Sequence, residues 1–197
     1  MNLYAYVGND PVNMIDPSGM ISYLVSRPLG HKAGNGSWMP AHHNFIVTGA
    51  NHLGDMGKHV TVVSFGQLEN GNMGRMHDSV YNDDVGHWES LGTKDTTASY
   101  RVINAKDSLV LKYANSVTEN LKYKLTPNAA GVGANSNSGA GAVASIDGGS
   151  TYVDNNAAQP GHTSASKVRF SGKNSDNGMS SGKTKICSGM GAQKGGC

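Results

Sequence analysis

Apolar residues in this chain occur in short runs separated by polar, glycine-rich stretches, which is typical of a sheet of short strands. Three runs are rich in β-branched or aromatic residues and a fourth alternates apolar with polar positions. The stretch 49–57 between the second and third runs has the composition of a hairpin loop. The four predicted strands cover residues 21–26, 43–48, 59–65 and 97–104.

Two further segments have helical patterns. Residues 107–121 place apolar side chains at close to 3.6-residue spacing, with Asp107 or Ser108 as the cap. Residues 139–146 are small and apolar and predict a tightly packed helix. Short strands are predicted at 123–125 and 167–170. The glycine-rich, polar stretch 66–95, which contains Trp88, is predicted to be a long surface excursion without regular structure.

Composition narrows the fold class. Hydrophobic residues make up 37% of the chain, charged residues 15%, and glycine occurs 27 times, which argues against a bundle of long helices. We therefore expect an α+β fold with a small antiparallel sheet, two or three helices and long glycine-rich loops. No apolar run approaches the length that spans a bilayer, about 20 residues, and no leader of the signal-peptide type opens the sequence.

The first twenty residues carry a specific motif. They read Asn-Leu-Tyr-x-Tyr from position 2, then Asn9-Asp-Pro, and close on Asp16-Pro-Ser-Gly-Met20. This resembles the closing motif of Rhs/YD-repeat shells, after which the toxin domain of a polymorphic toxin begins. The resemblance implies three parts: a shell tail at 1–20, a toxin domain at 21–170 and, from its Gly/Ser/Lys-rich composition, a flexible tail at 171–197.

The same resemblance implies how such a toxin is released. Members of this family cleave themselves after the motif with a pair of aspartates, so the cut here would fall between Met20 and Ile21. Asp16 matches one aspartate, and the second would precede residue 1. The implied partners are the shell of the parent chain, the secretion machinery that exports it and a cognate immunity protein. The implied destination is a target cell, with cytoplasm or periplasm left open.

Two segments combine residues that can carry catalysis. His43 opens an apolar strand, so we expect its ring at a sheet edge that a substrate can reach. Ser136 lies in Asn-Ser-Asn-Ser, immediately before the predicted small-residue helix, where free backbone N–H groups stabilise anions. A serine nucleophile needs a neighbouring base, and histidine is the usual one.

This pairing resembles circularly permuted papain-like hydrolases of the NlpC/P60 and lecithin-retinol-acyltransferase group, in which the histidine strand precedes the nucleophile helix. The resemblance implies that His43 is the base and Ser136 the nucleophile of a hydrolase or acyltransferase acting on an amide or ester. The group's usual nucleophile is cysteine, so serine at 136 is a departure. The residue that orients the histidine should come from the next strand, where the candidates are Thr61, Ser64 and Gln67.

Several alternatives stay open. Asn-Ser-Asn-Ser can simply cap a helix, and His43 can be a structural histidine. A metal-independent ribonuclease would need His43 and a cation, with Arg101 or Lys124 as candidates. The formal charge of the whole chain is +2, which is too weak by itself to indicate nucleic-acid binding. Without residues 1–20 it is +4, from 16 basic and 12 acidic residues, and this mild positive charge slightly favours the ribonuclease. A pore former is least favoured, because no amphipathic or apolar span is present.

No cofactor is implied by the sequence. Histidines and aspartates gather between residues 77 and 87, but their spacing fits no metal motif, so we expect no metal site. Cys187 and Cys197 lie in the Gly/Ser/Lys-rich tail and are interpreted as incidental thiols.

Overall fold

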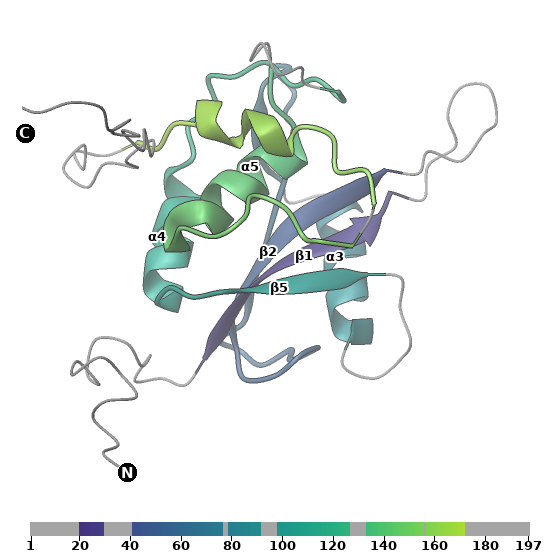
Figure 1. Ribbon diagram of the computed structural model, residues 1–197, viewed down its shortest axis with the longest axis vertical. Helices are drawn as coiled ribbons and strands as arrows, with labels where there is room; N and C mark the ends of the chain where they lie inside the picture. The colour runs from purple at the N-terminus through teal and green to yellow at the C-terminus, as the bar shows by residue number, and fades with distance from the viewer. Residues whose placement is uncertain are drawn as a thin grey trace, which may run out of the picture.

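The fold is built on one antiparallel sheet, shown in a computed structural model of the chain (Figure 1). The structure describes residues 20–29, 41–76, 79–91, 98–126, 133–155 and 157–171. Five strands pair in the order β4-β3-β2-β1-β5. All four pairings are antiparallel. The strands are β1 (Ile21–Pro28), β2 (His42–Ala50), β3 (Thr61–Gln67), β4 (Met73–Met76) and β5 (Ser99–Ile103).

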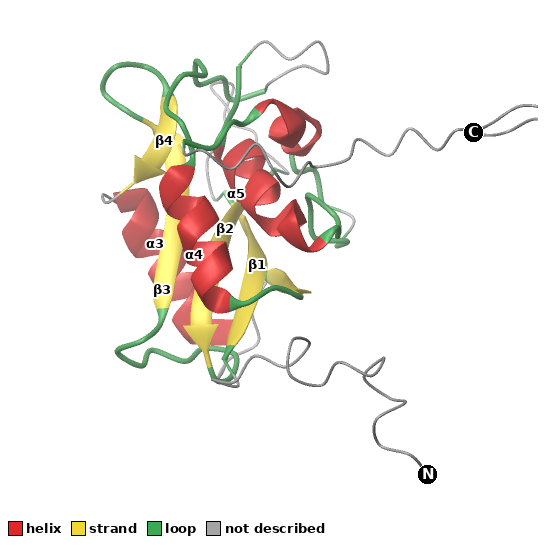
Figure 2. Cartoon of the chain, turned by 90° about the vertical axis from the view of Figure 1, so that its left-hand side faces the viewer, coloured by secondary structure: helices red, strands yellow, loops and turns green. Residues whose placement is uncertain are grey.

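Helices cover both faces of the sheet (Figure 2). One face is covered by α3 (Ser79–Leu91) and the other by α4 (Asp107–Ser116) and α5 (Ser136–Ala144). Two 3₁₀ segments follow, η1 (Ser145–Asp147) and η2 (His162–Lys167), and η2 packs on α5. The α+β prediction, with a small antiparallel sheet and helices, is confirmed. No described helix has the length and apolarity needed to cross a membrane.

Alternation along the strands creates two hydrophobic cores. Successive side chains of a strand point to opposite faces, so Tyr23 and Val25 pack with Trp88 of α3. Leu24, between them, packs in the cluster that includes Val143 of α5. Because helices cover both faces, the central strands are buried throughout, which explains why they read as nearly continuous apolar runs.

The prediction of a surface excursion at 66–95 is wrong. Its described part forms β4 and α3, and Trp88 is fully buried, with its Nε1 donating to the Asp55 carbonyl 2.7 Å away. Tyr81, Val85 and Trp88 face the sheet at i, i+4 and i+7. This stripe is narrow and polar residues interrupt it, so the composition of the segment did not indicate a helix. The stability of the helix comes from tertiary packing.

The other boundaries differ by a few residues. α4 ends at Ser116, five residues before the predicted end, and its N-cap is Lys106, without a side-chain cap hydrogen bond. The strand predicted at 167–170 is wrong, because only Phe170 forms a bridge, to Val117. The segment 123–125 forms a bridge at Tyr123 alone. Predictions for residues 1–19 and 172–197, including Asp16 and both cysteines, lie outside the described residues.

Candidate active site

The candidate site lies where β2 and β3 separate. The two strands pair from Thr48–Thr61 to Ile46–Val63, and there the pairing ends. Beyond this point β3 continues beside β4 from Ser64 onward. The first part of β2 therefore keeps its pairing with β1 but has no strand on its other side. β2 is the central strand of the sheet, but His43 lies near its first end, where, of the described strands, only β1 pairs with it.

The side chain of Asn137 takes the place of the missing strand. Its Oδ1 accepts from the backbone N–H of Asn44 at 2.7 Å, and its Nδ2 donates to the carbonyl of His42 at 2.9 Å. These two groups are two residues apart on one edge of β2, the spacing that a neighbouring strand satisfies in an antiparallel ladder. The first turn of α5 is thereby fixed to the end of β2.

We expect Asn137→Ala to lower the free energy of unfolding by about 2–4 kcal/mol. The change leaves the buried N–H of Asn44 and the carbonyl of His42 without partners, and each such group costs about 1–3 kcal/mol. Urea denaturation followed by circular dichroism measures the loss. The exposed Asn120, changed to alanine in the same way, should alter stability by less than about 0.5 kcal/mol. Equal effects of the two changes would show that Asn137 does not stabilise the junction.

The residues of the Asn-Ser-Asn-Ser segment have different roles. Asn135 is the N-cap of α5, and its side chain accepts from the amide of Ser138 at 3.1 Å. Ser138 completes the capping box by accepting from the Asn135 amide and also donates to the Gly161 carbonyl. Ser136 has no hydrogen-bonded side-chain partner among the described residues. Capping, the alternative interpretation, therefore describes Asn135 and Ser138 and does not account for Ser136.

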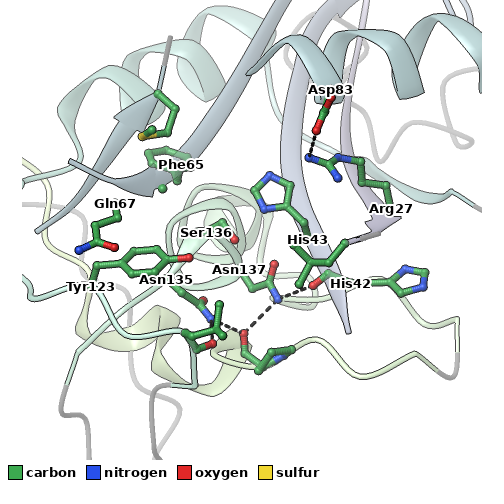
Figure 3. A pocket seen from close by; sticks show the side chains of 15 residues that line it. Arg27, His42, His43, Phe65, Gln67, Asp83, Tyr123, Asn135, Ser136 and Asn137 are labelled. Carbon is green, nitrogen blue, oxygen red and sulfur yellow. Dashed lines mark hydrogen bonds and ion pairs between the residues drawn. The ribbon is translucent and has the colours of Figure 1, made fainter. Parts of the chain in front are cut away.

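Ser136 and His43 line one pocket of about 280 Å³ (Figure 3). The pocket wall combines apolar side chains from β3 and the following segments with polar side chains from β1, β2 and α5. Ser136 is 6% exposed and His43 3%, so both are shielded yet reach the cavity surface. Arg27, Gln67, Asp83, Tyr123 and Asn135 also line the pocket.

Behind His43 lies a buried network centred on Asp84 of α3. The Nε2 of His43 lies 2.9 Å from Asp84 Oδ2. Arg27 Nε donates to the other carboxylate oxygen at 2.5 Å, and Ser64 Oγ donates to Oδ2 at 2.5 Å. Asp84 is 0% exposed. A buried carboxylate is tolerated only when it is paired and hydrogen-bonded, and here each oxygen is bound.

These partners determine the protonation of the site. Burial raises the pKa of Asp84, but His43, Arg27 and Ser64 together outweigh burial and hold that pKa below its ordinary value. Asp84 is therefore a carboxylate at neutral pH, and it accepts the Nε2–H of His43. In the neutral imidazole this leaves Nδ1 without a proton. Nδ1 has no hydrogen-bond partner among the described residues, so it is free to act as a base.

The structure brings some of the predicted site residues together and places others elsewhere. His43 and Ser136 meet at one pocket, Gln67 lines it and Ser64 contributes through Asp84, whereas Thr61 pairs with Thr48 at the other end of the strand. Arg101 instead binds Asp147 at 2.8 Å. Neither it nor Lys124 is among the residues that line the pocket.

Neighbouring histidines have other environments. The Nδ1 of His42 lies 3.2 Å from Ser26 Oγ. Burial lowers the pKa of His42. His87 follows Asp84 on α3, and burial followed by the charge of Arg27 lowers the pKa of this histidine. No group of three potential metal ligands occurs among the described residues, and His77 and Asp78 lie outside them.

Sequence reasoning gave Arg27 no role and considered Asp84 only as one of the potential metal ligands between residues 77 and 87. A signal for Asp84 was present, because Asp84 falls on the same helical face as Tyr81, Val85 and Trp88, and a carboxylate on an apolar face needs a buried partner. The pattern could be seen only once α3 was recognised as a helix.

Comparison of the chain with models of known protein families, with curated proteins and with solved structures gives no match.

Proposed function

We propose that residues 21–170 form an effector toxin that cleaves or transfers the acyl group of an amide or ester. Ser136 is the nucleophile, His43 the base and Asp84 the residue that orients the base. One observation carries the proposal. Ser136, at the start of α5, takes no part in capping and shares a pocket with His43, whose Nε2 is bound to the buried carboxylate of Asp84.

The arrangement meets the needs of a serine nucleophile. A serine hydroxyl must lose its proton during attack, so it requires a base in place and a means of stabilising the resulting imidazolium. His43 Nδ1 takes the proton as the Ser136 Oγ–carbon bond forms. Asp84 keeps the ring in the correct tautomer and stabilises its charge. The backbone N–H groups that begin α5 have no helical partner and can donate to the developing oxyanion.

The toxin part of the proposal is supported by the motif in residues 1–20. Its resemblance to the end of an Rhs shell favours release at Met20–Ile21, delivery into a target cell and neutralisation by a cognate immunity protein. β1 begins at Ile21, directly after the proposed cut, so cleavage there would leave every described strand and helix intact. The order of the histidine strand before the serine helix also supports a circularly permuted papain-like hydrolase.

A fluorophosphonate probe tests the nucleophile without knowledge of the natural substrate. We expect the intact protein to carry one adduct within residues 21–197, at Ser136, identified by peptide mass spectrometry. Ser136→Ala should abolish labelling, whereas Ser145→Ala, at the other end of the same helix, should leave it unchanged. Among the described residues, the hydroxyl of Ser145 bonds only to the Ala142 carbonyl. Absence of labelling at Ser136 in the unaltered protein would contradict the proposal.

A metal-independent ribonuclease is the second candidate, and one observation favours it. Arg27, which sequence reasoning did not consider, lines the pocket beside His43 and supplies the cation that Arg101 and Lys124 do not. However, Arg27 Nε is already bound to Asp84, and Asp83 lies 3.9 Å from its Nη2. Ser136→Ala separates the two functions, because a ribonuclease using His43 and Arg27 would survive this change.

A further inference from the structure

Tyr123 reaches into the same pocket from a segment tied to the start of α5. Its backbone forms a parallel bridge with Ala134, the residue before the N-cap. The amide of Lys124 donates to the Ala134 carbonyl, and the amide of Ala134 donates to the Lys122 carbonyl, both at 2.9 Å. On its other side the Tyr123 amide donates to the carbonyl of Gly71 at 3.0 Å. These hydrogen bonds fix the backbone of Tyr123 beside the start of α5.

Gly133 permits this close approach. It adopts a φ of +87°, and a Cβ at this position would lie 2.9 Å from the Lys122 carbonyl oxygen. Any other residue would be strained there and would push the two segments apart. The backbone is thus built to hold Tyr123 against the start of α5.

The phenol of Tyr123 is an unused donor. Figure 3 shows its hydroxyl directed toward the first turn of α5. It has no hydrogen-bond partner among the described residues, although a shielded tyrosine hydroxyl usually finds one. Burial raises the pKa of Tyr123, so the hydroxyl keeps its proton at neutral pH.

Other side chains near Ser136 are less suited to donate. Both hydrogens of the Asn135 amide are committed, to the carbonyls of Leu125 and Pro160. Both hydrogens of the Asn137 amide are committed as well, to the carbonyls of His42 and Pro160. Gln67 lines the pocket but is exposed, so water can satisfy its amide.

We propose that Tyr123 is a catalytic residue that donates a hydrogen bond to the oxyanion formed when Ser136 attacks an acyl carbon. This inference rests on the proposed function. In the step, the Ser136 Oγ–carbon bond forms, the carbonyl π pair moves to oxygen, and the serine proton passes to His43 Nδ1. The tetrahedral intermediate then collapses, the bond to the leaving group breaks, and His43 returns the proton to that group. Tyr123 stays protonated throughout and binds the oxyanion together with the first amides of α5.

The test compares Tyr123→Phe with Tyr152→Phe, which removes the same hydroxyl from a tyrosine that is 40% exposed and does not line the pocket. Turnover of p-nitrophenyl butyrate and the rate of fluorophosphonate labelling at Ser136 are measured for both variants. Removing one oxyanion donor typically costs about 10²–10³ in kcat, so we expect a loss of that order for Tyr123→Phe, with KM nearly unchanged. Tyr152→Phe should keep its rate within about twofold, below the effect of a lost oxyanion donor.

The outcomes separate this inference from the proposed function. If the unaltered protein is labelled at Ser136 but Tyr123→Phe reacts at the same rate, the oxyanion role is wrong and the nucleophile stands. If the unaltered protein is not labelled at Ser136, both fail. Should Tyr123→Phe not fold, the pH profile of labelling in the unaltered protein decides: a rate that falls as the tyrosine ionises supports the donor, and a rate that does not fall overturns it.

Discussion

Replacing His43 by alanine should abolish both esterase activity and killing. In a serine protease with a Ser-His-Asp group, loss of the base alone costs about as much as loss of the whole catalytic group, on the order of 10⁶ in kcat. We expect a comparable loss here, because His43 is the base of the proposed mechanism. Induced expression in a sensitive bacterium, directed once to the cytoplasm and once to the periplasm, measures killing and identifies the target compartment.

The matched control is His52→Ala. His52 is exposed on the loop between β2 and β3, where its Nδ1 bonds to the carbonyl of Leu53, and it should be dispensable. Circular dichroism verifies that each variant is folded. A folded His43→Ala protein that still kills would exclude both the hydrolase and the ribonuclease. Loss of killing in His43→Ala beside full killing in Ser136→Ala would favour the ribonuclease.

Asp84→Asn should reduce both catalysis and stability. An amide can present its N–H to His43 Nε2 and hold the ring in the wrong tautomer, an effect that costs about 10⁴ in kcat for a catalytic aspartate. The same change removes the negative charge that compensates the buried Arg27. Breaking a buried ion pair by removing one partner costs about 3–5 kcal/mol, so we expect a loss of that size in urea denaturation.

The pH dependence follows from the direction of the Asp84 pKa. Its folded-state pKa lies below the unfolded value, which is about 3.9 for aspartate. The stabilisation from its charge is therefore complete above that pH and is lost as pH falls through the lower folded value. Asp84→Asn should flatten the acid side of the stability curve.

Asp83→Asn is the control for both effects. Its side chain is 68% exposed and lies 3.9 Å from Arg27 Nη2, so solvent screens the pair. Because Asp83 is exposed, we expect the pair to contribute about 0–1 kcal/mol, as surface pairs do, and kcat should not change. If Asp84→Asn behaved like Asp83→Asn, Asp84 would have no part in orienting His43.

The local sequence was sufficient to predict the strands and the helix that carry the proposed nucleophile and base. β-Branched runs identified β1, β2 and β3, because a strand buried on both faces needs continuous apolar side chains. Polar capping residues before a small-residue segment indicated the start of α5, since the N-cap hydrogen bonds are formed within four residues. The strands and the helix start both depend on residues close together in the sequence, so the sequence pattern is sufficient to predict them.

Only the tertiary structure decided how these residues work together. Asp84 is 41 residues from His43, and its contact with His43 arises only when α3 packs against the sheet. Which side chain of the Asn-Ser-Asn-Ser segment lines the pocket without a hydrogen-bond partner also depends on distant parts of the described chain. The partners that occupy Asn137 come from β2, and the carbonyls bound by Asn135 and Ser138 come from Leu125, Pro160 and Gly161. Among the described residues, the hydroxyl of Ser136 has no partner because segments distant in sequence bind the groups beside it. No sequence window around Asn-Ser-Asn-Ser includes those segments.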